Sequence, residues 1–331
     1  MRAWRAFVRW VATHPVTSLV VFFAVFPFIV PHTSLATQVL TYGLFALGFN
    51  LLYGYTGILS FGHAAYYGLG AYGTGLALAK LKIASLWGAI GIGLGAAIIG
   101  GVIAGFFCLR RRGIYFAMLT LAFAQMLYFI AFHLADITGG DDGLRGIPLH
   151  PLGLFGTSVS IRSPFAFYVF AFVLVSLAVA ALKRILDSPF GAVLQAIREN
   201  PERAAACGYD VNRIKFVSFV FSAFFAGLAG ALEALRLTVV PVEALYWSTS
   251  GQVVIMTLLG GAGTFFGPFV GALTFLLLEE RLSRLIEWWP IVVGAIFMTF
   301  VLFLPKGIWG SFLAWVVRDA SPKPPYAPVP E

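Results

Sequence analysis

The stretch of sequence that decides the fold is residues 83–108, which read IASLWGAIGIGLGAAIIGGVIAGFFC and carry no charged side chain. The run is longer than the roughly 20 apolar residues that an α-helix needs to cross a bilayer. Glycines spaced by four, such as Gly91 with Gly95 and Gly101 with Gly105, let helix backbones approach closely in lipid, where the hydrophobic effect between helices is lost. The stretch therefore predicts a transmembrane helix held within a helical bundle.

The whole chain has the composition of a membrane protein. Of its 331 residues, 60% are hydrophobic and 11% are charged, against about 45–50% and about 25% in soluble domains, and its mean hydropathy is +0.90. A soluble enzyme and a disordered chain are both excluded, because the first needs a polar surface and the second needs low hydrophobicity. The two cysteines, Cys108 and Cys207, are too few for a disulfide framework and are expected to be free thiols.

Ten apolar segments are candidates for transmembrane helices, which predicts an all-α, polytopic membrane protein. They are 16–30, 36–53, 58–78, 83–108, 114–134, 165–182, 216–235, 251–260, 266–278 and 289–304. The glycine-rich segments 58–78 and 83–108 are expected near the centre of the bundle. Segments 251–260 and 266–278 are short and interrupted by glycines and Pro268, so either both cross or they form one broken pair that does not cross fully.

The basic residues give an orientation. If the N-terminus is cytoplasmic and every segment crosses, 15 of the 22 Lys and Arg residues lie inside, as the positive-inside rule requires. Both termini are then cytoplasmic. The expected parts are a cytoplasmic segment (1–15), a transmembrane domain (16–310) with a polar cytoplasmic loop (183–215), and a proline-rich cytoplasmic tail (311–331).

Polar groups inside the expected spans are neutral. Asn50, Ser60, His63, Thr120 and Gln125 either form hydrogen bonds between helices or line a translocation path. Acidic residues occur only toward span ends, at Glu233, Glu279 and Glu280, where snorkelling to the interface is expected. No ATP-binding loop, metal-ligand pattern or nucleophile elbow is found. We therefore expect no cofactor or metal in this chain and energy supplied from outside it.

Two loops stand out. The outer loop contains Thr138, Gly139, Gly140, Asp141, Asp142 and Gly143. This pattern predicts a tight turn with accessible carboxylates, which docks an external protein, shapes the outer mouth or is simply a solvated turn.

The inner loop 183–215 predicts two short helices. Ser188 can cap the first helix, with Pro189 at its first position. Phe190 and Ile197 lie on its apolar face, and Asn200 ends it after Arg198 and Glu199. The first helix also contains Gly191. Glu202 begins the second helix, and Gly208 can end it. Such a compact unit is either a handle for a cytosolic motor or an amphipathic helix on the membrane surface.

Several of these stretches together resemble the branched-chain amino acid ABC permeases of the LivM type. The similar stretches, in order, are NLLYGYTGILSFGHAA (50–65), RGIYFAMLTL (112–121), TGGDDGL (138–144), SPFG (188–191), AIREN (196–200), LGGAGT (259–264) and LPKG (304–307). Arg203 departs from the EAA pattern that ABC importers carry in the cytoplasmic loop.

The resemblance implies a machine with other subunits. Its expected partners are a homologous second permease subunit, two cytoplasmic ATPases that bind ATP and magnesium, and a periplasmic substrate-binding protein, in a bacterial inner membrane. By resemblance, residues 188–208 couple the permease to the ATPases. Sister families carry urea, short amides or aromatic acids, so the solute stays open. A stand-alone carrier or channel is an alternative function from another class of protein. A membrane enzyme is a further alternative, and the only sequence feature that supports it is the proximity of His133 and Asp136.

Overall fold

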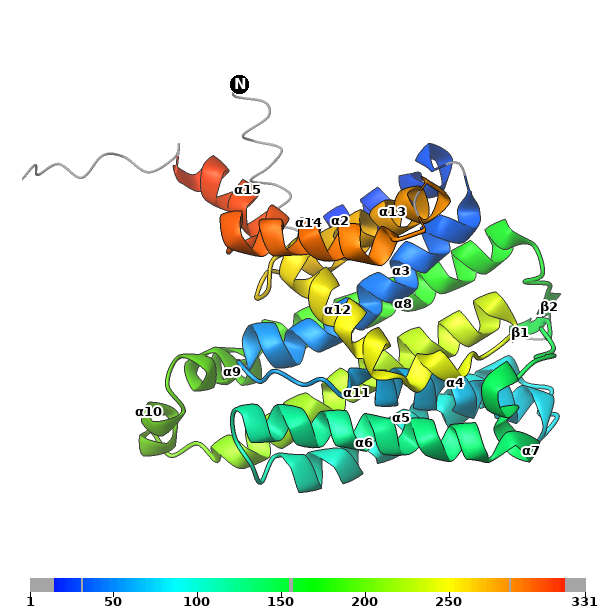
Figure 1. Ribbon diagram of the computed structural model, residues 1–331, viewed down its shortest axis with the longest axis horizontal. Coiled ribbons are helices and arrows are strands. Elements are labelled where there is room, and N and C mark those ends of the chain that lie inside the picture. The colour runs from blue at the N-terminus through cyan, green and yellow to red at the C-terminus, as the bar shows by residue number, and fades with distance from the viewer. Residues whose placement is uncertain (1–14, 31, 155–156, 286, 319–331) are drawn as a thin grey trace, which may run out of the picture.

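The computed structural model describes residues 15–30, 32–154, 157–285 and 287–318, and it is helical apart from one short hairpin (Figure 1). The expected segment 1–15 lies almost wholly outside the described residues, as does the tail beyond 318. The elements are α2 (Pro15–Ile29), α3 (Thr33–Asn50), η1 (Leu51–Tyr55), α4 (His63–Ala79), α5 (Leu86–Cys108), α6 (Ile114–His133), α7 (Ala135–Thr138), η2 (Gly140–Asp142), β1 (Leu152–Leu154), β2 (Thr157–Val159), α8 (Pro164–Leu186), α9 (Pro189–Glu199), α10 (Pro201–Ala206), α11 (Val211–Leu237), η3 (Val242–Leu245), α12 (Trp247–Gly260), α13 (Gly267–Leu285), α14 (Trp289–Phe303) and α15 (Gly307–Arg318).

Every segment expected to span overlaps a helix. Among the residues that the structure describes, five helices are long and apolar enough to cross a membrane. These are Thr33–Tyr55, Leu86–Cys108, Ile114–His133, Pro164–Leu186 and Val211–Leu237. The count of ten is not confirmed, because α4, α12 and α14 have 17, 14 and 15 residues, short of the roughly 20 that a helix needs to cross. An additional helix, α15, begins before the expected tail and extends into it.

The centre of the bundle is built where glycines remove side chains between helices. A Cβ on Gly230 of α11 would lie 1.9 Å from the Tyr67 carbonyl oxygen of α4, and a Cβ on Gly70 would lie 2.1 Å from the Gly227 carbonyl oxygen. Helix α4 is accordingly buried almost throughout. Helix α5 differs from the expectation of a central position: its glycine face contacts α4, but Ile99 and Phe107 face outward. One-sided glycine spacing brings a helix close to one neighbour and leaves its other face for lipid.

Two breaks interrupt the helices. Residues 56–62 run without helix between η1 and α4, and residues 261–266 separate α12 from α13. The second break confirms the expected interruption: α12 and α13 fold back on each other so tightly that a Cβ on Gly271 would lie 1.7 Å from the Met256 carbonyl oxygen. Whether both helices cross the bilayer stays a prediction.

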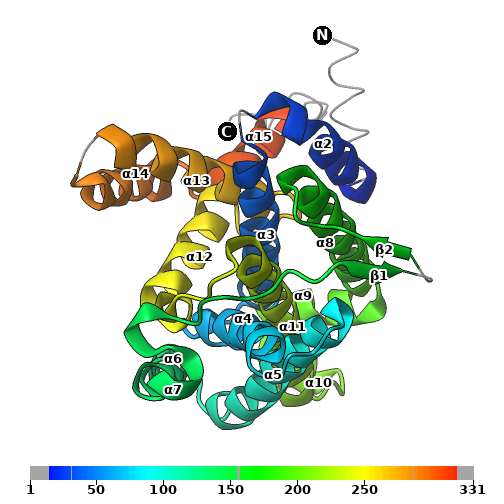
Figure 2. The same cartoon turned by 90° about the vertical axis from the view of Figure 1, so that its right-hand side faces the viewer.

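The bundle has two distinct ends. Helices α9 and α10 project from one end, and the hairpin with α7 lies at the other, at the left and right of Figure 1. Figure 2, which looks onto the hairpin end, shows α3, α4 and α11 near the middle, with α5, α8, α12 and α14 around them. Helix α11 runs from beside α10 toward the hairpin end, where Val240 pairs with Leu144.

We predict that Gly230→Val lowers the free energy of unfolding by about 3 kcal/mol, because the added side chain meets backbone that cannot move aside. Gly91→Ala is the matched control, since no heavy atom lies within 4 Å of its new Cβ. Denaturation of both variants in detergent micelles measures the difference. Equal stability of the two variants would show that the close approach of α4 and α11 is not required.

Candidate functional site

The projecting unit of α9 and α10 is rigidly joined to the bundle. The chain turns tightly between α8 and α9, because a Cβ on Gly191 would lie 2.1 Å from the Leu186 carbonyl oxygen. Pro189 occupies the first turn of α9, while the Ser188 hydroxyl donates to the Ile185 carbonyl at 2.6 Å instead of capping α9 as expected. The ring of Phe190 packs edge-on against Phe221 of α11.

The second half of the unit shows a helix cap and two exposed carboxylates. The Asn200 side chain accepts from the Arg203 N–H at 2.9 Å and so caps α10. Gly208, with φ of +89°, follows the end of α10. Glu199 and Glu202 are exposed or half-exposed and so are available to a partner. The sequence therefore located both helices correctly.

Arg198 is exposed on α9, and its side chain reaches the edge of the bundle. Its guanidinium donates to the Gly54 carbonyl of η1 and lies so close to Gly263 that a Cβ there would come within 2.8 Å of Nη1. Gly57, with φ of +77°, passes beside the Arg198 side chain. One side chain thus joins the projecting unit to both chain breaks.

Asn50 binds the second break, at Gly263 and Thr264, from within the bundle. Its amide nitrogen donates to the Thr264 carbonyl at 2.9 Å, and its amide oxygen accepts from the Gly263 N–H at 2.8 Å. The preceding helix continues into the π-helix η1, a rare form that is frequent at functional sites. We call Asn50, Gly54, Arg198, Gly263 and Thr264 the inner junction.

The break at 56–62 is held by the other predicted polar residues. Thr120 of α6 accepts from the Phe61 N–H at 3.2 Å, and Ser60 accepts from the Gly62 N–H at 3.3 Å. Ser222 donates to the Gly48 carbonyl at 2.6 Å, so its oxygen accepts from Nε2 of His63 at 2.7 Å. These hydrogen bonds supply partners for polar backbone and side-chain groups that a continuous helix would otherwise satisfy.

The structure therefore brings four of the five predicted path residues to the two breaks. Asn50, Ser60, His63 and Thr120 are fully buried, and each forms a hydrogen bond. The bonds of Asn50, His63 and Thr120 join separate segments, which favours the interhelical interpretation for these three. Ser60 bonds to the nearby Gly62 N–H, and Nδ1 of His63 has no partner in the part of the chain that the structure describes. Gln125 does not join them; it is half-buried on α6 and its amide oxygen has no partner among the described residues. Their role in a translocation path stays a prediction.

The outer turn lies at the hairpin end and is built from the expected glycines. Gly139, Gly140 and Gly143 have φ values of +85°, +59° and +70°. Thr138 is buried and donates to the Leu134 carbonyl at 2.8 Å. The remaining predicted docking residues, Asp141 and Asp142, are exposed, and Asp142 pairs with Arg145. The turn is therefore a rigid acidic surface, and what docks there stays a prediction.

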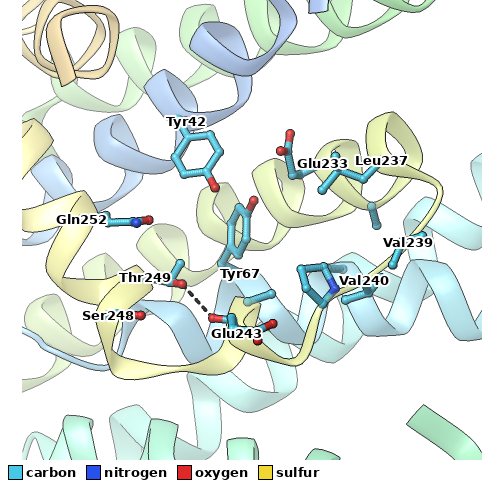
Figure 3. A pocket seen from close by; sticks show the side chains of 14 residues that line it. Tyr42, Tyr67, Glu233, Leu237, Val239, Val240, Glu243, Ser248, Thr249 and Gln252 are labelled. Carbon is cyan, nitrogen blue, oxygen red and sulfur yellow. Dashed lines mark hydrogen bonds between the residues drawn. The ribbon is translucent and has the colours of Figure 1, made fainter. Parts of the chain in front are cut away.

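A cavity of about 320 Å³, which the sequence analysis did not find, lies between α3, α4, α11, η3 and α12 (Figure 3). Tyr42 and Tyr67 line it with ring centroids 6.1 Å apart, and Gln252 points toward them from α12. Tyr42, Tyr67 and Gln252 come from three separate helices and carry no sequence motif, so no local signal could have assembled them.

Glu233 at this cavity corrects the expectation of a snorkelling side chain. It is only 5% exposed. Its carboxylate accepts from Arg236 at 2.6 and 2.8 Å and from the Thr41 hydroxyl at 3.0 Å. The three-residue spacing to Arg236 on one helix was the available signal, because oppositely charged side chains at that spacing are neighbours.

The glycine-packed apolar helices, the buried breaks and the projecting unit define a helical membrane protein of the permease class. The chain belongs to the family described as "Branched-chain amino acid transport system / permease component", which matches residues 32–304. The chain is similar to the high-affinity branched-chain amino acid permease protein LivM of Escherichia coli K12, with 28% identity over 88% of this chain and 73% of that protein.

Two other relatives are also named as branched-chain amino acid transport permeases. The probable LivM permease of Methanocaldococcus jannaschii is 26% identical over 73% of this chain and 78% of its own. The LivH permease of Escherichia coli K12 is 24% identical over 82% of this chain and 91% of its own. No solved structure matches the chain. The relatives are transport permease subunits and not enzymes, which confirms the resemblance seen in the motifs.

We predict that Asn50→Ala lowers the free energy of unfolding by about 2 kcal/mol, because it leaves the Gly263 N–H and the Thr264 carbonyl without their partner. Asn212→Ala, at an exposed position on α11, is the control and should change stability by less than about 0.5 kcal/mol. Chemical denaturation in micelles compares them. A loss at Asn50 no larger than at Asn212 would contradict the structural role of the inner junction.

Proposed function

We propose that this chain is the transmembrane permease subunit of an ATP-driven importer for branched-chain amino acids. The observation that carries the proposal is the attachment of the projecting unit to the bundle: Arg198 of α9 donates to Gly54 and passes beside Gly263. A force applied to α9 is thereby applied to the ends of α3 and α12 together. A permease without an ATP-binding motif of its own needs such a mechanical input.

The proposed partners follow from the two ends of the bundle. Cytoplasmic ATPases grip α9 and α10 at the exposed Glu199 and Glu202. A loaded substrate-binding protein docks on the opposite end at the outer turn with Asp141 and Asp142. A second, homologous permease subunit completes the path, as the names of the LivM and LivH relatives support. The proposed location is a bacterial inner membrane with both termini cytoplasmic.

The direct test is reconstitution into liposomes of the chain with its second permease, ATPases and binding protein. We expect uptake of labelled leucine only when ATP is present on the side of the membrane that carries the ATPases and loaded binding protein is present on the other side. Liposomes with this chain alone should take up none. ATP-independent uptake by the chain alone would overturn the proposal in favour of a self-sufficient carrier.

We predict that Arg198→Ala lowers the leucine taken up per ATP hydrolysed by about tenfold, because the variant loses the charge-assisted bond that joins α9 to η1. Arg203→Ala, an exposed arginine on α10 in the same loop, is the matched control and should keep the normal ratio. Parallel uptake and phosphate-release measurements on the reconstituted importer give the ratio. Unchanged coupling in Arg198→Ala would show that force reaches the bundle by another route.

A further inference from the structure

The cavity between α3, α4, α11, η3 and α12 divides into an apolar and a polar wall. Leu237, Val239 and Val240 line the apolar side. Glu243, Ser248 and Gln252, from η3 and the beginning of α12, supply the polar side (Figure 3). A volume of about 320 Å³ is at the lower limit of ligand sites, so the cavity suits one small molecule that is apolar at one end.

The charge of the cavity comes from one side chain. Glu233 is compensated, because Arg236 donates to both of its carboxylate oxygens. Glu243 is exposed on η3 and forms no ion pair within the described part of the chain. Its backbone carbonyl accepts from the Thr249 hydroxyl at 2.8 Å, which fixes η3 against α12. A ligand that enters the cavity therefore meets one uncompensated negative charge.

The neighbouring groups complete the recognition of a zwitterion. The aromatic rings of Tyr42 and Tyr67 line the cavity, and an aromatic ring attracts a cation that lies over its face. The Ser248 hydroxyl and the Gln252 amide can donate to a carboxylate, and Ser248 lies in the first turn of α12, where the helix dipole favours negative charge. An ammonium and a carboxylate are thus accommodated on adjacent parts of the polar wall.

We propose that this cavity is a transit site within the permease itself for an aliphatic α-amino acid, with Glu243 selecting the ammonium group. The inference rests on the proposed function and extends it, because it places a second selection step after the binding protein. Urea and short amides carry no ammonium, and deaminated acids place their negative charge against Glu243, so the site disfavours both. The aliphatic side chain then lies against Leu237, Val239 and Val240.

The first test uses the complete importer in liposomes at saturating loaded binding protein. We expect Glu243→Gln to lower the rate of leucine uptake about tenfold, with less than a twofold change in ATPase stimulation by the binding protein, and Glu243→Asp to retain more of the uptake. Glu287→Gln removes an exposed carboxylate from the turn between α13 and α14 and should transport normally. Normal leucine uptake by Glu243→Gln would overturn the proposed transit site and leave the proposed function intact. Absence of ATP-dependent uptake by the wild type would instead overturn the proposed function.

The second test measures occupancy without partner subunits. Val239→Cys in a Cys207→Ser background places one accessible thiol at the cavity, because Cys108 is buried. We expect millimolar L-leucine to slow maleimide labelling of this thiol at least threefold, and 4-methylpentanoate, which lacks the ammonium, to have no effect. Adding Glu243→Gln should abolish the protection. Equal protection by the two compounds, protection that survives Glu243→Gln, or no protection by leucine would each overturn the proposal.

Discussion

The hydrocarbon core of a bilayer holds no water to satisfy backbone N–H and C=O groups, so every break in a helix needs partners from the protein itself. Among the described residues, the stretches 56–62 and 261–266 interrupt helices within the packed bundle. Asn50 bonds to both polar groups offered by the second break, at Gly263 and Thr264. Thr120 bonds to the first at Phe61. This requirement explains Asn50 and Thr120 before any role in transport is considered, whereas it does not explain Gln125, whose amide oxygen has no partner in the ranges that the structure describes.

The breaks also give the bundle places where it can move. A continuous helix transmits force along its length, whereas α12 and α13 meet at glycines that approach to backbone contact. Arg198 joins the projecting unit to Gly54 just before the first break, and Gly263 of the second break lies against it. In the proposed importer, movement of α9 acts on both breaks. The cavity lies farther along the same helices, at α3 and α12, so the inner junction and the cavity share two helices.

Local patterns predicted much of the fold because each depends on residues close in sequence. Apolar length located the helices, Pro189 and Asn200 marked α9 and α10, and the glycines marked the outer turn. The cavity could not be predicted, since Tyr42, Tyr67 and Gln252 meet only after three helices pack. Burial of Glu233 was missed for the same reason: its partner Thr41 lies 192 positions away. The short length of α4 was missed because an apolar run does not show where its helix begins.

The account requires α9 and α10 to face the cytosol, where ATPases can grip them. Cys207 follows α10 and is exposed, whereas Cys108 is buried, so the native chain carries one reporter thiol at this site. The decisive measurement is labelling with a membrane-impermeant maleimide in intact cells and in permeabilised cells. The account predicts labelling of Cys207 only after permeabilisation. Labelling of Cys207 in intact cells would place the projecting unit outside and contradict the account.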